Sequence, residues 1–357
     1  MHVAVKILTG YATQLNRESK LRELEVLQCL SSMSQASTSH LARMVTYFYH
    51  PGVEDDGEHL CLVMELLGPS IQATREALKD RVIPVLTVKH ALRHMLLGLT
   101  CLHTCGVAHT DLKPDNIMVE LGSRWTPEAI NSWVKANPPR TYAPEQSLTK
   151  MVSAFVSQSL PPPALDEFAS LNFKLADFSS GTFIKSLVYA QQPKPVCLAQ
   201  FVSDQTTDDI TPLGLRPPEI VLGGEWDESV DIWTYGCMVF TLLTGRPLFA
   251  PVAWAEKDAS EVDVLLYQMI LFCGEFFKQD FIRHCSRSLD YFRLDYRLKK
   301  FQHFVRKPFQ KCILDTGRAL TADDVEGAAA LMSRCLRLDP KDRATAQELL
   351  EDPWLKS

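Results

Sequence analysis

The spacing of hydrophobic and polar positions predicts strands near the start of the chain and helices beyond them. Residues 2–8 alternate and are rich in valine and isoleucine, which predicts a strand. Residues 60–67 are apolar almost throughout and predict a buried strand that ends at Gly68. Leucines recur at helical spacing across residues 15–30 and predict an amphipathic helix. Residues 88–102 carry an apolar stripe with a period of 3.6, which predicts a long helix.

Length and charge narrow the class of protein. At 357 residues the chain exceeds the usual size of one hydrophobic core, so two lobes or domains are expected. A hydrophobic fraction of 46% and a charged fraction of 22% describe an ordinary soluble globular protein. The net charge of −6 argues against a general nucleic-acid binder and is compatible with a basic peptide substrate.

Cysteine usage and apolar runs indicate an intracellular protein without a membrane segment. The ten cysteines include no CxxC pair, which favours reduced thiols in the cytosol or nucleus. The longest apolar run, residues 232–243, is shorter than the roughly 20 residues that span a bilayer, so we expect a buried core helix there. The chain opens without a basic and apolar leader, so no secretory signal is expected.

Two motifs carry the candidate chemistry. Residues 109–116 read HTDLKPDN, and residues 177–179 read DFS. They place a candidate proton acceptor, an ammonium group and two metal-binding side chains on two loops, as phosphoryl transfer requires. The order His-x-Asp-Leu-Lys-Pro-x-Asn, followed by Asp-Phe, resembles the protein kinase family. The resemblance implies an α+β fold of two lobes, with ATP and Mg²⁺ as cofactors.

The resemblance assigns roles to the residues of these loops. Asp111 would accept the proton of the substrate hydroxyl or orient that hydroxyl. Lys113 would neutralise charge on the transferring phosphoryl group, and a lysine two residues after the aspartate is the serine/threonine-kinase pattern. Asn116 and Asp177 would bind Mg²⁺ through oxygen atoms, which are the ligands that this hard cation prefers.

The resemblance extends to the first 67 residues. Lys6 ends a Val-Ala-Val-Lys strand and matches the family's lysine for the α and β phosphates. Glu23 matches the helical glutamate that pairs with this lysine, and Glu25 is the alternative. Met64 would guard the back of the adenine pocket. The backbone from Glu65 to Leu67 would bond the edge of adenine.

The HTDLKP run and the long stretch between the two motifs are similar to the SR-protein kinase branch of the CMGC group, in its fungal form, whereas Ser179 is a departure from the family pattern. Thr110 replaces the arginine that pairs with a phosphorylated activation loop in most kinases, so activation by such phosphorylation is not expected. Ser179 replaces the glycine of Asp-Phe-Gly but leaves the carboxylate of Asp177 in place. Sixty residues separate Asn116 from Asp177. The branch implies transfer to serine in arginine-serine-rich splicing factors, and so a role in mRNA processing.

The residues between Asn116 and Asp177 are expected to form an insert at about 122–170. Its many prolines predict an irregular, exposed segment, with amphipathic turns at 147–156 that fold against the large lobe. The flanks, 117–121 and 173–176, have the pattern of hairpin strands. A retained intron in the gene prediction is the alternative explanation of the insert.

The second half of the chain completes the resemblance. Glu219 ends a segment like the activation segment, and Arg343 is its expected buried partner. Asp231 matches the aspartate that supports the catalytic-loop backbone. Residues 254–314 resemble the helical insertion of the CMGC group. Carboxylates that could line a groove for arginine-rich substrates are Glu225, Asp227, Glu228, Asp258, Glu261 and Asp263.

The predicted organisation is one kinase domain over residues 1–357, with a truncated small lobe to residue 66 and a large lobe from residue 67. The family's glycine-rich loop precedes the lysine strand, whereas this chain begins four residues before Val5. We expect the natural protein to be longer. The alternatives are a catalytically impaired pseudokinase or gene-model fragment that acts as a scaffold, and a kinase of the same group with another substrate. A monomer that binds neither nucleic acid nor membrane is expected.

Overall fold

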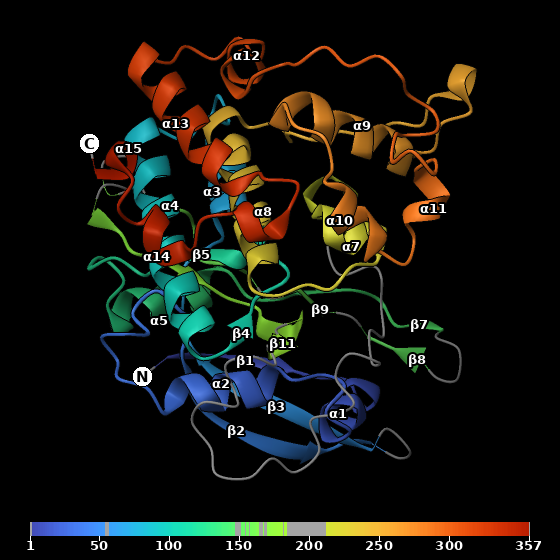
Figure 1. Cartoon of the computed structure of the whole chain (residues 1–357). Coiled ribbons are helices and arrows are strands. Elements are labelled where there is room, and N and C mark those ends of the chain that lie inside the picture. The colour runs from blue at the N-terminus through green and yellow to red at the C-terminus, as the bar shows by residue number, and fades with distance from the viewer. Residues whose placement is uncertain are drawn as a thin grey trace.

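The computed structural model of the chain describes residues 2–53, 57–146, 151–153, 155–156, 158–163, 167, 170–180, 182–183 and 212–356. Figure 1 shows two lobes, with the blue small lobe at the bottom of the view and a larger, mainly helical lobe above it. The long teal helix of the large lobe descends toward the small lobe, so the end of that helix lies near the junction between the two.

The small lobe is built on a three-stranded antiparallel sheet with the order β1-β3-β2. Its strands are β1 (Val3–Ile7), β2 (Met44–Pro51) and β3 (Glu58–Glu65). The strand predicted at residues 2–8 is therefore confirmed, and so is the buried strand at 60–67. Strand β1 nevertheless leaves its apolar side chains exposed, whereas Leu60 and Leu62 of β3 are fully buried.

The amphipathic helix expected across residues 15–30 is confirmed for residues 23–30, but its extent was wrong, since two helices occupy this region. They are α1 (Gly10–Arg17) and α2 (Glu23–Ser31). The backbone turns at Ser19, whose φ of 56° is left-handed and cannot continue a helix. The side chain of Asn16 donates a hydrogen bond to the Leu21 carbonyl oxygen at 2.9 Å and so bridges the break.

The large lobe is helical, with α4 (Val85–Thr104) and α8 (Ser229–Thr244) near its centre (Figure 1). Helix α8 is buried almost throughout, which confirms the core helix expected at 232–243. In the described part of the chain, no helix combines the length and apolarity needed to cross a membrane. The remaining helices of the lobe are α3 (Ile71–Ala77), α7 (Pro218–Leu222), α9 (Glu261–Cys273), α10 (Gln279–Arg283), α11 (Ser288–Tyr291), α12 (Phe309–Leu314), α13 (Ala322–Cys335), α14 (Ala346–Leu349) and α15 (Pro353–Lys356).

Short strands flank the two loops that carry residues 109–116 and 177–179. Strand β5 (Ile117–Val119) pairs antiparallel with β10 (Phe173–Leu175), which confirms the hairpin flanks predicted around the insert. Strand β4 (Val107–Ala108) pairs with β11 (Thr182–Phe183). The short 3₁₀ helices are η2 (Pro114–Asn116), η4 (Phe178–Ser180), η5 (Leu213–Leu215), η6 (Ala255–Lys257) and η7 (Pro340–Asp342).

The insert is more regular than the sequence predicted. Helix α5 (Pro127–Ala136) begins after Thr126, whose hydroxyl accepts a hydrogen bond from the Ala129 amide at 3.3 Å. Pro127 occupies the first turn of α5, where its missing N–H costs nothing, so this proline starts a helix instead of breaking one.

Beyond α5, the insert holds two short strand pairs. They are β6 (Arg140–Thr141) with β9 (Phe155–Val156), and β7 (Glu145–Gln146) with β8 (Met151–Val152). The amphipathic turns expected at 147–156 lie partly outside the described residues, and the described residues of that stretch include two strands.

Candidate active site

The predicted site residues Lys113 and Asn116 both contact the carboxylate of Asp111. The Oδ2 atom of Asp111 accepts hydrogen bonds from Lys113 Nζ at 2.7 Å and from Asn116 Nδ2 at 3.1 Å. Asn116 Nδ2 also donates to the backbone oxygen of Asp111 at 2.9 Å. The 3₁₀ helix η2, which starts at Pro114, brings Asn116 back beneath Asp111. The Asp111 carboxylate is therefore held in one orientation, with a cation beside it.

Helix α8 fixes the backbone of this loop through Asp231. Both oxygens of that buried carboxylate are used: Oδ2 accepts from the His109 amide and Oδ1 from the Thr110 amide, each at 2.8 Å. The Nε2 atom of His103 lies 2.9 Å from Oδ2. Burial alone raises the pKa of Asp231, but the hydrogen bonds and nearby histidines outweigh burial and hold it below its usual value.

The backbone that Asp231 holds is strained. Thr110 has a φ of 65°, in the left-handed region that β-branched residues rarely adopt. Two backbone N–H groups bonded to a charged carboxylate offset that strain. The prediction that Asp231 supports this loop backbone is confirmed by its hydrogen bonds with the His109 and Thr110 amides.

Lys6 bridges the two lobes through two carboxylates. Its Nζ atom lies 2.8 Å from Glu23 Oε1 on α2 and 2.8 Å from Asp177 Oδ1 in the large lobe. Glu25, the alternative partner, is exposed and lies 3.6 Å from Arg22 instead. The structure therefore brings Lys6, Glu23 and Asp177 together and leaves Glu25 outside the group.

Burial and ion pairing shift the pKa values of Lys6, Glu23 and Asp177 in opposite directions. Burial lowers the pKa of Lys6, but Glu23 and Asp177 outweigh it and raise that pKa overall. Burial raises the pKa of Glu23 more than Lys6 lowers it. Burial also raises the pKa of Asp177, yet the hydrogen bond from Lys6 brings it below its usual value. Asp177 is therefore a carboxylate at neutral pH, as a cation ligand must be.

Asp177 reaches this position because its loop is tied to the catalytic loop. The amide of Ala176 donates to the Asn116 carbonyl oxygen at 2.9 Å, and His109 Nε2 lies 3.1 Å from the Ala176 oxygen. Phe178 is fully buried, with its ring 5.6 Å from that of His109. Asp177 itself has a φ of 63°, so the turn is made at the aspartate. These contacts thus tie the two loops to each other.

The residues expected around adenine lie at the end of β3. Met64 is half-buried and faces Ala4 of β1 across the sheet. The carboxylate of Glu65 accepts from Lys174 Nζ at 2.9 and 3.0 Å and from the Arg43 amide at 2.8 Å, so its side chain ties β3 to β10. Leu67 packs against the core. No short motif contains Lys174 and Glu65 together, which is why the sequence did not reveal this pair.

Farther from the loops, the predicted partners Arg343 and Glu219 form a bidentate ion pair at 2.6 and 2.7 Å. Three of the groove carboxylates make local contacts. Asp227 accepts from the Ser229 amide, Asp258 pairs with Lys300 at 2.6 Å, and Asp263 caps α9. Residues 184–211 of the predicted activation segment lie outside the described residues.

Residues 1–126 and 166–355 match the protein kinase domain family. The chain is 27% identical to the serine/threonine-protein kinase SRPK of Physarum polycephalum, over 99% of this chain and 79% of that protein. It is 24% identical to protein kinase dsk1 of Schizosaccharomyces pombe, over 99% of this chain and 76% of that protein.

A serine/threonine protein kinase of Aspergillus fumigatus is 28% identical, over 94% of this chain and 74% of its own length. The family match covers both lobes and omits residues 127–165, which fall within the insert. The α+β fold class, the protein kinase activity and the resemblance to SR-protein kinases predicted from the sequence are confirmed. The chain therefore belongs to the protein kinase domain family.

Proposed function

We propose that this kinase transfers the γ-phosphoryl group of ATP to serine side chains in arginine-serine-rich proteins. The observation that carries the transfer is the arrangement of Asp111. Its carboxylate is buried, oriented by Lys113 and Asn116, and placed on a loop that is tied to the loop of Asp177. Catalysis of phosphoryl transfer depends on such positioning and on placed charge.

Asp111 orients the serine hydroxyl and accepts its proton as the new P–O bond forms. Lys113 sits 2.7 Å from Asp111 and supplies positive charge beside the transferring group. Because Lys113 and Asn116 both donate to the Asp111 carboxylate in the free protein, that group is held in one orientation before the substrate binds. The hydrogen bond from Asn116 Nδ2 to Asp111 Oδ2 helps to fix the orientation of that carboxylate.

The cofactor residues have the chemistry that ATP and Mg²⁺ require. Asp177 offers an ionised carboxylate, and Asn116, whose Nδ2 is turned to Asp111, keeps its amide oxygen as a ligand. Such hard oxygen donors suit Mg²⁺, which when bound neutralises phosphate charge. Lys6 would hold the α and β phosphates, with Glu23 fixing its position. Met64 and the backbone of Glu65 to Leu67 would contact adenine.

Serine and arginine-rich substrates are supported by three observations. Lys113 stands where serine/threonine kinases carry it. Two relatives are named as serine/threonine kinases, one of them as an SRPK. The net charge of −6 suits a basic peptide. The free cysteines of the described chain suit the reducing cytosol or nucleus, where we place the protein.

The test is transfer of radiolabelled phosphate from ATP to an Arg-Ser repeat peptide. Lys-Ser and Arg-Thr repeats serve as matched peptides, and Asp111→Asn serves as the variant of equal size. We expect transfer to the Arg-Ser peptide to exceed transfer to the other two. Asp111→Asn should lower the rate by about 10²–10⁴-fold, the usual contribution of a general base.

Two outcomes would overturn parts of the proposal. No transfer by the folded protein, with Mg²⁺ and ATP in excess, would favour the scaffold alternative. Equal transfer to all three peptides would leave the kinase activity standing but remove the arginine-serine preference.

A further inference from the structure

A nearly buried lysine, Lys174 on β10, joins two segments at the junction of the lobes. Its side chain is 9% exposed. The Nζ atom lies 2.9 and 3.0 Å from the two carboxylate oxygens of Glu65, at the end of β3, and 3.5 Å from Glu120 Oε1, just beyond β5. An ammonium group in such a place is costly without partners, so the position of Lys174 depends on these two carboxylates.

The start of β2 holds Glu65 from a second side. The Glu65 amide donates to the Arg43 carbonyl oxygen at 2.9 Å, and the Arg43 amide donates to Glu65 Oε1 at 2.8 Å. The amide of the preceding residue, Ala42, donates to the Leu175 oxygen on β10 at 2.8 Å. Among the described residues, Lys174 is the only cation that pairs with the Glu65 carboxylate.

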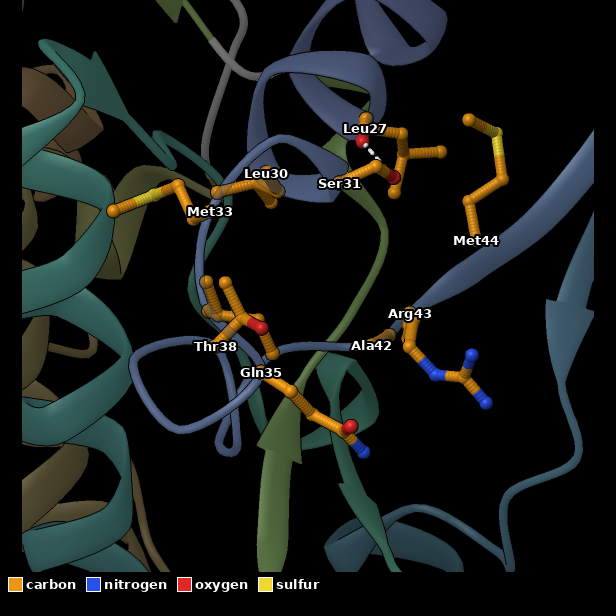
Figure 2. Close-up of a pocket in the computed structure, with 10 residues that line it drawn as sticks. Leu27, Leu30, Ser31, Met33, Gln35, Thr38, Ala42, Arg43 and Met44 are labelled. Atoms are coloured by element: carbon orange, nitrogen blue, oxygen red, sulfur yellow. Dashed lines mark hydrogen bonds between the residues drawn. The ribbon is translucent and has the colours of Figure 1, made fainter.

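Packing adds little to this support. Figure 2 shows Ala42 and Arg43 where the chain enters β2, across a cavity from Ser31 at the end of α2. The cavity holds about 190 Å³. Atoms that face a cavity lack packing partners on that side. Glu65 is therefore held mainly by its hydrogen bonds and by the charge of Lys174.

The stretch after Glu65 is tied at its other end to the same hairpin. The Gly68 amide donates to the Val119 oxygen on β5 at 2.7 Å, and a Cβ atom at Gly68 would crowd that oxygen at 3.0 Å. Strand β5 pairs with β10, which carries Lys174. Leu67 lies between the two ties, and no hydrogen bond in the described part of the chain uses its backbone. The backbone of Leu67 is thus available to a ligand at a fixed place.

We propose that Lys174 is a positioning residue for the nucleotide, which acts through Glu65 to hold the backbone of residues 65–67 in the conformation that binds adenine. This inference rests on the proposed function, which places adenine against that backbone. Asp111 and Asp177, at the site of transfer, lie on other loops. Loss of the Lys174 charge should therefore weaken the binding of ATP without changing the transfer step itself.

The experiment measures ATP binding by the full chain. The dissociation constant of radiolabelled ATP is determined by equilibrium dialysis with Mg²⁺, and kcat and KM for ATP are then measured with the Arg-Ser repeat peptide. Lys174→Met keeps the apolar stem but removes the charge. We expect its dissociation constant and KM to rise by about 5–20-fold, as is typical of coupling between two sites, with kcat unchanged. Lys174→Arg keeps a cation and should restore most of the affinity.

Glutamine variants separate the two partners of Lys174. Glu65→Gln should raise the dissociation constant as Lys174→Met does, and the double variant should raise it no further, because both changes break the same link. If Lys174→Met fails to fold, Glu65→Gln carries the test, since Lys174 keeps Glu120 as a partner. Glu120→Gln is the matched control. It removes the carboxylate that lies at the base of the insert and should leave the affinity for ATP unchanged.

Three outcomes would overturn the inference. An unchanged dissociation constant in folded Lys174→Met or Glu65→Gln would show that the pair only stabilises the fold. A lower kcat with unchanged KM, or an equal loss of affinity in Glu120→Gln, would also contradict it. Absence of ATP binding by the wild type would overturn the proposed function as well. Binding without phosphate transfer, in contrast, would remove the proposed function and leave the role of Lys174 in place.

Discussion

The ion pair between Arg343 and Glu219 shows how a single residue ties distant parts of the large lobe. Both side chains are completely buried. Arg343 also donates to the backbone oxygens of Ser229 and Arg337, at 2.9 and 3.0 Å, and lies 5.2 Å from the Trp233 ring centre. All three guanidinium nitrogens thus donate hydrogen bonds inside the protein, four bonds in total, where no water can replace a lost partner.

Removal of one partner should therefore cost much more than removal of both. We expect Arg343→Met to lower the free energy of unfolding by about 3–5 kcal/mol, because Glu219 would stay buried without a counter-charge. The double variant Arg343→Met with Glu219→Leu should recover most of that loss. Urea unfolding of the two single variants and the double variant measures the coupling. Additive losses would show that the pair is not the main source of the cost.

Sequence reasoning reached the contacts that belong to motifs and missed those that do not. Lys6 with Glu23, and Arg343 with Glu219, were expected because each residue stands in a recognisable run. The pair of Lys174 and Glu65 joins residues 109 positions apart. Glu65 lies in the stretch assigned to adenine and Lys174 in a predicted hairpin strand, but no motif joins the two, so only the tertiary fold could reveal their pairing.

At the scale of elements, α4 and β10 are joined through a group of histidines. His94 Nδ1 accepts a hydrogen bond from the Phe173 amide at 3.1 Å, and His40 Nδ1 donates to the Phe173 oxygen at 3.2 Å. The His94 ring lies 4.0 Å from that of His40 and 4.2 Å from that of His90. Burial, followed by the nearby histidines and Arg93, lowers the pKa of His94 to about 3.

This arrangement predicts a loss of stability in mild acid. The unfolded chain protonates His94 below a pH of about 6.5, whereas the folded chain keeps it neutral down to about 3. Unfolding in this window takes up a proton. The free energy of unfolding therefore decreases as the pH is lowered from about 6.5 toward 3. Between pH 7 and pH 5 we expect His94 to contribute a loss of about 2 kcal/mol.

Unfolding at several pH values, with wild type beside His94→Gln, measures this contribution. Glutamine keeps an acceptor for the Phe173 amide but cannot titrate, so the slope should flatten. His40 and His90, whose pKa values burial also lowers, contribute to the same pH window. The exposed His284 is a control, and His284→Gln should leave the slope unchanged. An unchanged slope in His94→Gln would contradict the assignment.

Element boundaries show where hydrophobic periodicity stops being informative. Residues 16–20 read NRESK and contain no apolar position, so periodicity could not show whether a helix continues there, and the break depends on the left-handed backbone of Ser19. Helix α5 was missed for a related reason. A proline counts against a helix except in its first turn, and the capping Thr126 was the signal that could have identified that turn.

For the molecule as a whole, the insert is a side branch: it connects the two strands of the β5–β10 hairpin, and these strands pair with each other at its base. Val119 faces Phe173 across β5 and β10, and the Glu120 amide donates to the Asn172 oxygen at 2.8 Å. A Cβ atom at Gly122 would lie 3.2 Å from Leu171 Cδ2, so the two ends of the insert are neighbours. The chain leaves and re-enters the large lobe at nearly one point.

Deletion of residues 123–170, with a short glycine turn between Gly122 and Leu171, should therefore preserve the kinase core. The insert contributes the buried Ile130 and a contact between Asn131 and His2 at 3.0 Å, while the active-site contacts lie in other segments. Because a short loop replaces a long one, the entropic cost of closing the hairpin does not rise. We expect the unfolding free energy to change by only about 1–2 kcal/mol and phosphate transfer to persist.

Asn131→Ala separates the contact with His2 from the rest of the insert. If both the deletion and Asn131→Ala slow transfer, the insert acts through the start of the chain, next to the strand of Lys6. If the deletion alone abolishes transfer while thermal unfolding stays cooperative, the insert takes part in the function, and its description as a side branch is wrong. Retained transfer in both would place all the catalytic requirements in the two segments that match the kinase family, residues 1–126 and 166–355.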